Sequence, residues 1–178
     1  NKFFLISLMN KLKNSLTIIT YHYIREINKA NKGLKFLSIK NFIKQLDYLN
    51  KSYHIVTPDE AKFMLKHKRF NNKFCWLTFD DGYKEHYDIV FHELEKRKLK
   101  GSFFPVVKCT TQKEILAVNK IQFIIAKIDK DLVLKKIQNY YDKKFINGLD
   151  FNKFIKTLDL NYRFEFDNKK TILIKRLL

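Results

Sequence analysis

The stretch CWLTFDDGY, residues 75–83, decides how the rest of this sequence is interpreted. It ends an apolar run with two adjacent carboxylates, Asp80 and Asp81, followed by Gly82. Neighbouring acids repel each other, and a stable fold does not require them at this place. Two interpretations are open: a solvated turn in which one aspartate caps the next helix, or a site where the carboxylates have a chemical role.

A chemical role needs the two side chains in one pocket. Adjacent residues of a continuing strand point to opposite faces, but Gly82 allows a sharp turn that can bring both carboxylates together. One carboxylate can then bind a cation while the other acts as a general base on a water molecule. Phosphoryl transfer on magnesium would use the same acids. That chemistry normally brings a glycine-rich loop before a helix, and this sequence, with Gly 4 in total, has none.

The pattern around the acid pair predicts alternating strands and helices. Apolar and β-branched runs indicate strands over residues 16–21, 53–57, 74–79 and 102–107. N-cap residues and helical spacing indicate helices over residues 39–52, 59–69 and 84–101. This order is typical of an α/β domain with parallel strands, in which active residues gather at the C-terminal ends of strands.

The helix that follows the acid pair is expected to be amphipathic. One face of it should carry Tyr87, Val90, Phe91 and Leu94, which recur at helical spacing. Such a face is suited to packing against the sheet, so this helix is expected to belong to the α/β core.

A different pattern follows the last strand. Helices are expected over residues 114–129, 132–141, 151–158 and 171–178, with no strand signal of comparable strength. The sequence is therefore divided into an N-terminal extension (1–15), an α/β core (16–110) and a mostly helical insertion (111–178). The abrupt end, without a cap or turn residues, indicates a chain cut from something longer.

The charge balance is strongly basic, at +18 from 36 basic and 18 acidic residues. Such a balance is typical of nucleic-acid or anionic-membrane partners. The lysines are nevertheless spread along the whole length, without a block of like charges, and Lys, Asn, Ile and Phe rise together in AT-rich genomes. We therefore expect dispersed charge and no specific nucleic-acid partner, with a basic nucleic-acid-binding protein kept as an alternative.

The sequence contains few features that indicate the cellular compartment of the protein. Cys75 and Cys109 form neither a disulfide framework nor a metal-binding C-x-x-C pair, which fits a reducing compartment. The apolar run at residues 3–9 is far shorter than the roughly 20 residues that span a bilayer, and no cleavage site follows it. No transmembrane segment is expected, and a cytoplasmic protein is favoured, with cell-envelope association as the alternative.

The wider string resembles the first motif of the polysaccharide deacetylase family, the family 4 carbohydrate esterases that include chitooligosaccharide deacetylases. The TFDDG motif at residues 78–82 follows an apolar strand and precedes a helix and the strand SFFPV at residues 102–106. Upstream, TYHY at residues 20–23 is similar to the strand end of exopolysaccharide deacetylases. LAVNKIQFIIAK at residues 116–127 resembles a helical insertion in a subgroup associated with surface-polysaccharide synthesis.

This resemblance implies a fold, a reaction and a set of roles. The fold would be an incomplete (β/α) barrel of the polysaccharide deacetylase type, similar to a TIM barrel, with a mostly helical C-terminal excursion. The reaction would be metal-dependent removal of N-acetyl groups from a surface or extracellular polysaccharide or its precursor. Asp80 would be the general base and Asp81 a ligand of a divalent metal, usually zinc. His22 and Tyr83 are candidate pocket residues.

The sequence departs from the family in one important respect. The family completes its metal site with an H-x-x-x-H pair, and no such spacing occurs among His22, His54, His67, His86 and His92. In relatives this pair follows the helical insertion, so it is expected beyond Leu178. The chain itself is therefore expected to be inactive or impaired, and a degenerate, non-catalytic carbohydrate-binding relative is the main alternative.

Overall fold

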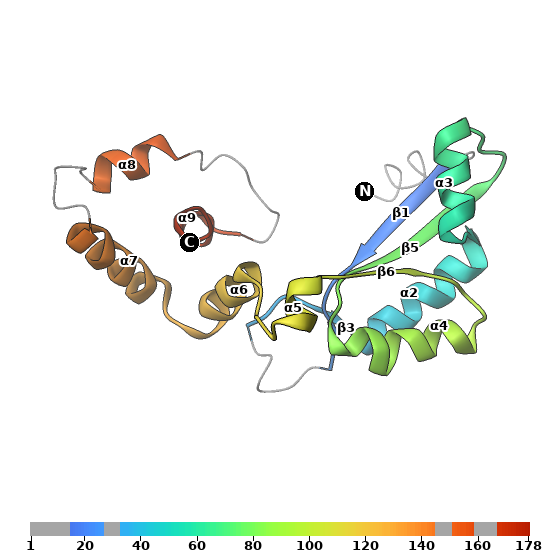
Figure 1. Cartoon of the computed structure of the whole chain (residues 1–178), viewed down its shortest axis with the longest axis horizontal. Coiled ribbons are helices and arrows are strands. Elements are labelled where there is room, and N and C mark those ends of the chain that lie inside the picture. Colours follow the sequence, from blue (N-terminus) through green and yellow to red (C-terminus); the bar gives the residue numbers. More distant parts are fainter. Residues whose placement is uncertain (1–14, 27–32, 145–150, 159–166) are drawn as a thin grey trace. The chain divides into compact units, whose positions relative to one another are not determined.

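The computed structural model describes residues 15–26, 33–144, 151–158 and 167–178 (Figure 1). The chain splits into two compact units, which are described separately. The first unit comprises Asn1–Ile27 and Lys35–Glu114, and the second comprises Asn28–Leu34 and Ile115–Leu178. The acid pair belongs to the first unit.

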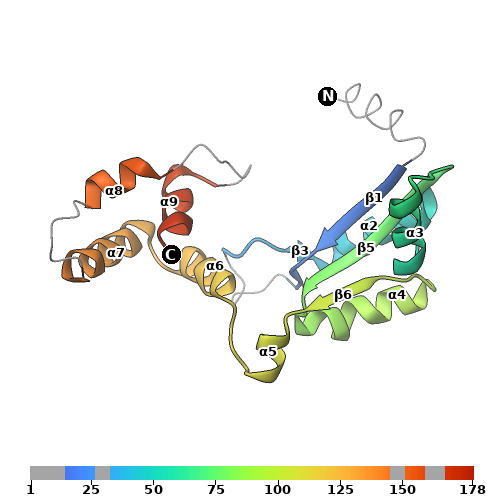
Figure 2. The same ribbon diagram turned by 45° about the horizontal axis from the view of Figure 1, so that its top comes forward.

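The first unit is built on a parallel sheet centred on β5 (Lys73–Asp81). Strand β1 (Ser15–Tyr21) pairs along one edge of β5 in a register that puts Tyr21 opposite Phe79. The other edge is shared by β4 (His54–Ile55) at the start of β5 and β6 (Ser102–Pro105) at its end. Figures 1 and 2 show β1, β5 and β6 running side by side. The predicted strands and their parallel arrangement are confirmed, and the described strands form an open sheet rather than a closed barrel.

Two helices of this unit begin at the expected caps. In α2 (Ile39–Ser52), the Ser38 hydroxyl accepts a hydrogen bond from the Asn41 amide at 3.3 Å. In α3 (Pro58–His67), Thr57 and Glu60 form a capping box, with the Thr57 amide donating to the Glu60 carboxylate at 2.7 Å. These bonds satisfy amides that have no partner inside the helix, so the first turn forms where the sequence predicts it.

One face of the sheet is covered by α2 and by the helix that follows the acid pair. Side chains from β5 pack there against residues of both helices, and the largest fully buried ones include Phe42, Leu46, Leu77 and Phe79. The Phe79 ring stacks on Tyr21 at 5.3 Å and meets Phe42 edge-on at 6.2 Å. This aromatic cluster is the core of the unit, because each ring removes a large apolar area from water.

The opposite face of the sheet is covered only in part. Helix α3 packs there against Phe74 and Trp76, with Val56 and Ala61 fully buried. Ile18, which lies opposite Trp76 in the sheet, is 48% exposed. The cover of this face is therefore uneven, because Ile18 is exposed whereas Thr78, the residue of β5 before Asp80 on this face, is only 5% exposed.

The helix after the acid pair differs from the expectation. It begins as a π-helix, η2 (His86–Phe91), and continues as α4 (His92–Lys96). Val90 and Leu94 are buried as predicted, but Tyr87 and Phe91 are 70% and 43% exposed. The predicted common face is therefore wrong, because the wider π-turn rotates successive side chains by less than 100° and separates residues that an α-helix would align.

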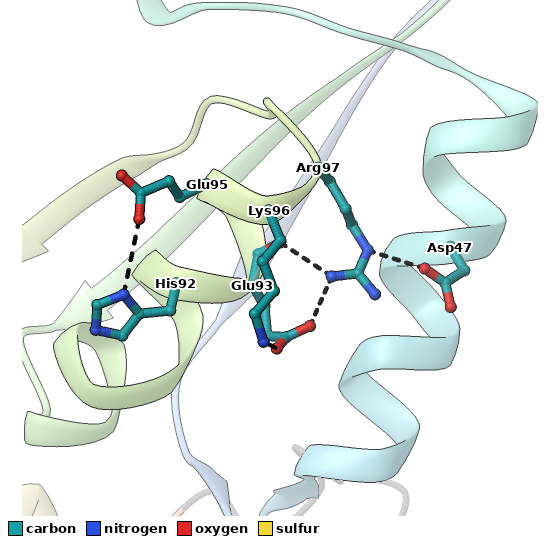
Figure 3. Close-up of polar contacts among 6 residues, drawn as sticks. All are labelled: Asp47, His92, Glu93, Glu95, Lys96 and Arg97. Carbon is teal, nitrogen blue, oxygen red and sulfur yellow. Dashed lines mark hydrogen bonds and ion pairs between the residues drawn. The ribbon is translucent and has the colours of Figure 1, made fainter.

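An arginine joins this helix to its neighbour (Figure 3). The Arg97 guanidinium lies 2.6 Å from the Glu93 carboxylate and 2.9 Å from that of Asp47 on α2. Hydrogen bonds from Lys96 and then Arg97 lower the pKa of Glu93 below its usual value. The contact holds α4 beside α2 and so fixes the far end of the helix that follows the acid pair.

Short elements that the sequence did not predict complete the first unit. Strands β2 (Ile24–Arg25) and β3 (Leu37–Ser38) form a separate parallel pair, and α5 (Val107–Thr111) follows β6. Each is only a few residues long, so periodicity gives no signal for it.

The second unit is helical within its described residues, as predicted. It contains α6 (Ala117–Lys127), α7 (Lys130–Lys144), α8 (Phe151–Thr157) and α9 (Lys169–Leu177). Ile172 and Ile174 of α9 are buried, and Lys170 pairs with Asp131 of α7 at 2.6 Å. No helix in the described part of the chain is long and apolar enough to cross a membrane.

Removing the Phe42 ring should show how much of the stability of the first unit comes from the aromatic cluster. We expect Phe42→Ala to lower the free energy of unfolding by about 3–5 kcal/mol, because a fully buried ring leaves a cavity. The matched control is Phe63→Ala on α3, where the ring is 57% exposed and the loss should stay below about 1 kcal/mol. Urea unfolding followed by Trp76 fluorescence measures both, and equal losses would contradict the assignment.

Candidate active site

The acid pair lies at the C-terminal end of β5, as the sequence predicts. Asp80 and Asp81 are its last residues and pair with Phe104 and Pro105 of β6. Asp81 has a φ of 73° and Gly82 a φ of 66°, both in the left-handed region. The chain therefore turns sharply at the second aspartate itself, one residue earlier than Gly82 alone would require.

Gly82 cannot be replaced without strain. A Cβ at this position would lie 2.7 Å from the Pro105 Cβ, closer than van der Waals contact allows. The backbone of Gly82 therefore packs against the ring of Pro105 at the end of β6. This contact holds the turn in place and so orients the side chain of Asp81, the residue before it.

His22 lies beside the first aspartate. It follows Tyr21, the partner of Phe79 in the sheet, and so stands next to Asp80. The His22 Nε2 atom is 3.9 Å from Asp80 Oδ2, and the two side chains are 54% and 38% exposed. This separation is too long for a hydrogen bond, but a water molecule can bridge it. Asp80 therefore keeps carboxylate oxygens open to solvent or to a ligand.

Tyr83 holds the second aspartate. Its hydroxyl donates to Asp81 Oδ2 at 2.6 Å, and its ring lies against that of Tyr23, with 4.3 Å between the ring centres and a tilt of 31°. Burial, and next the hydrogen bond to Asp81, raise the pKa of Tyr83 above its usual value. The phenol therefore keeps its proton at neutral pH and remains a donor, which orients Asp81.

A cation supports this pair of rings. The Arg25 guanidinium lies 4.2 Å from the centre of the Tyr23 ring and 5.6 Å from that of Tyr83. The Arg25 Nε atom is also 2.6 Å from the Glu85 carboxylate. The ion pair of Arg25 and Glu85 therefore joins the two segments that carry Tyr23 and Tyr83, and neither charged residue was singled out in the sequence.

His86 connects the two strand ends. Its Nε2 atom lies 2.7 Å from the His22 carbonyl oxygen, and the ring is 3% exposed. Burial lowers the pKa of His86, so the ring is neutral at neutral pH and Nε2–H is the donor to that carbonyl. No sequence pattern indicates this role, because the contact joins residues far apart in the chain.

The acids and histidines do not assemble a complete metal centre in the described residues. No group of three or more His, Cys, Asp or Glu side chains that could hold a metal ion is found there. Asp81 supplies a carboxylate with one oxygen bound by Tyr83, whereas a catalytic zinc site takes three protein ligands. The described residues therefore do not fit a metal ion by themselves.

Comparison with known families identifies the fold that this site belongs to. Residues 67–133 match the polysaccharide deacetylase family model, a span that contains the acid pair, η2 and β6. Residues 67–133 are therefore similar to a polysaccharide deacetylase domain. This result agrees with the TFDDG motif, and it confirms the family predicted from the sequence.

Individual relatives cover different parts of the chain. YxkH of Bacillus subtilis, a protein named for the same family, is 29% identical over 109 residues, which is 60% of this chain and 37% of YxkH. IcaB from Ammonifex degensii is 30% identical, covering 54% of this chain and 40% of IcaB with a TM-score of 0.47. The chain therefore spans well under half the length of either protein.

A third relative shows the fold over most of the chain. The Streptococcus pyogenes deacetylase PplD, solved in complex with acetate, covers 93% of this chain and 81% of its own length. Its TM-score is 0.50 at 17% sequence identity, so this similarity concerns the fold alone. The roles of Asp80, Asp81, His22 and Tyr83 stay predictions.

The left-handed backbone at Asp81 can be tested by comparing two substitutions. We expect Asp81→Gly to be more stable than Asp81→Ala by about 1 kcal/mol, because the Cβ of alanine is strained in a left-handed backbone conformation and glycine has no Cβ. At Asp80, which lies in the strand, the order should reverse, and Asp80→Ala should be the more stable of that pair. Thermal unfolding of the four variants gives the answer, and the same order at both positions would refute the turn geometry.

The buried phenols predict a loss of stability at alkaline pH. Burial raises the pKa of Tyr21 to about 12 and also raises that of Tyr83. Each folded phenol binds its proton more tightly than the unfolded chain, so its stabilisation is present below the unfolded pKa of about 10 and is lost as pH rises through the folded value. We expect the urea midpoint to fall from pH about 10 upward, and less steeply in Tyr83→Phe. An identical slope in that variant would contradict the assignment to Tyr83.

Proposed function

We propose that this chain carries the general base of a carbohydrate N-deacetylase, an enzyme that hydrolyses the N-acetyl groups of a polysaccharide or its precursor. The observation that carries the proposal is the placement of Asp80. It lies at the C-terminal end of a central parallel strand within the TFDDG motif, with its side chain 38% exposed and His22 3.9 Å away. The match of residues 67–133 to the polysaccharide deacetylase family model supports the same reaction class.

The reaction that we propose is hydrolysis of an acetamide. Asp80 takes a proton from water while the water oxygen attacks the acetamide carbonyl carbon. The carbon–nitrogen bond then breaks, the acetyl group leaves as acetate, and the nitrogen takes up the proton that Asp80 removed from water and leaves as an amine. Asp80 suits the first step because its side chain is 38% exposed, so a water molecule can reach it.

Asp81 has a different proposed task. Tyr83 occupies its Oδ2 atom and holds the carboxylate in one orientation. The family resemblance implies a divalent metal, usually zinc, which polarises the carbonyl when bound. Asp81 would be one ligand, and the described residues do not supply the others. No step is therefore assigned to a metal in this chain.

A non-catalytic carbohydrate-binding protein is the second candidate. The absence of a complete ligand group from the described residues favours it. The two candidates share a fold and a ligand class and differ in hydrolysis alone. They are separated by measuring binding and acetate release on the same N-acetylated sugar oligomers.

The first experiment uses the 178-residue chain. We expect it to bind zinc weakly and to release little or no acetate from N-acetylglucosamine oligomers, because one carboxylate holds zinc poorly without imidazoles fixed in geometry. Asp81→Asn should weaken the residual zinc binding further, whereas Asp80→Asn should leave it largely intact. Release of acetate at an enzymatic rate by this chain would show that the ligands are not where the resemblance puts them.

The second experiment tests the base. In a longer form that carries an H-x-x-x-H pair, deacetylation should appear, and Asp80→Asn should abolish it while zinc binding stays largely unchanged. An unchanged rate in that variant would remove Asp80 as the base. Binding of oligomers without any hydrolysis in the longer form would favour the non-catalytic candidate.

A further inference from the structure

Helix α6 of the second unit has polar side chains on its inner side and apolar side chains on its outer side. Asn119 is only 6% exposed, and the Oε1 atom of Gln122 is buried. Val118, Phe123 and the C-cap residue Ile128 are 49%, 38% and 42% exposed. A surface helix of a globular protein normally has the opposite arrangement. The packing of the second unit therefore does not account for the apolar side of α6.

A close backbone contact fixes this orientation of the helix. A Cβ at Gly33 would lie 2.5 Å from the Ala126 carbonyl oxygen, so the chain at Gly33 passes directly against the backbone of α6. Asn119, Gln122 and Ala126 follow one another at spacings of three and four, which places them on one side of the helix. A rotation that hid the apolar side chains would break the contact with Gly33.

The outer side of α6 carries a continuous apolar row. Val118, Ile121, Ile124 and Ile128 follow one another at spacings of three and four, so their side chains are neighbours on the helix surface. Ile121 and Ile124 are half-buried, and the two ends of the row are exposed. Exposed apolar patches mark sites that bind proteins or membranes. The row is therefore a candidate interaction surface.

The charges beside the row are positive. Lys120 and Lys127 are exposed, and they are the only charged residues of the α6 sequence AVNKIQFIIAK. Residues 115–178 as a whole carry 14 Lys and Arg against 7 Asp and Glu. A partner for this surface must therefore combine negative charge with an apolar layer.

This combination favours a lipid bilayer over a macromolecule. Lysine is depleted at protein interfaces, whereas at a bilayer its stem lies along the apolar layer while its ammonium reaches the phosphates. A second copy of the chain would bring its own net charge of +18 against the same lysines. Nucleic acid offers phosphates but no apolar layer for Val118 and Ile128, which cannot stack on bases as aromatic rings do.

We propose that α6 is a docking surface for an anionic lipid bilayer. The helix would lie in the plane of the interface, with the apolar row at the boundary of the acyl chains and Lys120 and Lys127 against the lipid phosphates. Phe123 would enter the same boundary beside the two lysines. This surface belongs to the second unit and goes beyond the proposed function, because it does not depend on the acid pair.

The first test is cosedimentation of the 178-residue chain with vesicles at about 0.1 M salt. We expect binding to phosphatidylcholine vesicles that contain about 30% phosphatidylglycerol and little binding to phosphatidylcholine alone. Phe123→Ser should weaken binding by roughly fivefold, because a partly exposed ring no longer leaves water on docking. The matched control is Phe63→Ser on α3, where the ring is 57% exposed and binding should be unchanged.

A second pair of variants separates docking through α6 from general attraction to a basic protein. Lys120→Gln combined with Lys127→Gln should weaken binding by roughly 25-fold, since each lysine lies at the lipid surface. Lys62→Gln combined with Lys66→Gln on α3 removes the same charge from two exposed positions and should change binding less than about twofold. Equal losses in the two double variants would overturn the proposal, because dispersed charge would then account for the binding.

The position of the helix is measured with brominated lipids, which quench tryptophan at the depth of the acyl chains. Phe123→Trp should be quenched strongly, and Phe63→Trp no more than the unaltered chain with Trp76. Equal quenching of the two variants would overturn the proposal. A marked fall in melting temperature in Phe123→Ser would also overturn it, because another part of the chain would then cover the ring. So would a dimer in light scattering that Phe123→Ser separates, since a second copy would then be the occupant.

Discussion

The register of β5 with its parallel neighbours is the constraint on which the first unit depends. Paired residues of neighbouring strands share a face of the sheet, so Leu77 and Phe79 meet α2 and α4 while Trp76 and Asp80 lie on the other face. A shift of β5 by one residue relative to its neighbours would exchange the residues that face the core with those that face the other side of the sheet. Asp80 would then enter the aromatic core, and Phe79 would be exposed. Core packing therefore fixes the face of the sheet on which Asp80 lies.

The second aspartate depends on a different balance. A non-glycine residue with a φ of 73° is strained, and such strain persists only where neighbouring contacts over-determine the conformation. Three contacts do so here: the pairing of Asp81 with β6, the close approach of Gly82 to Pro105, and the hydrogen bond from Tyr83. The strain and the orientation of the carboxylate therefore have the same origin. Tyr83 is a positioning residue in this arrangement, since it acts through Asp81.

Features encoded by neighbouring residues were predictable from the sequence. The strand ending in Asp80 and Asp81 is a continuous apolar run. The capping box is recognisable in the sequence because Glu60 follows Thr57 by three residues. The family motif then assigned distinct tasks to the two acids. The π-turn was not predictable, because helical periodicity assumes the α-repeat, and Tyr87 and Phe91 were therefore placed on the wrong face. The contacts of Arg25 and His86 join distant segments, and only the folded sheet brings them together.

The outer edge of β6 has a consequence for how copies of this protein behave in solution. Among the described strands β6 pairs with β5 alone, and Phe103 and Phe104 beside that edge are 37% and 50% exposed. An open edge with apolar neighbours is a template for adding a strand from another molecule, and Pro105, which has no N–H, blocks only its last position. The net charge of +18 opposes this association through repulsion between copies. That repulsion reaches about 10 Å at 0.1 M salt and about 3 Å at 1 M, so the colloidal stability of the protein depends on low ionic strength.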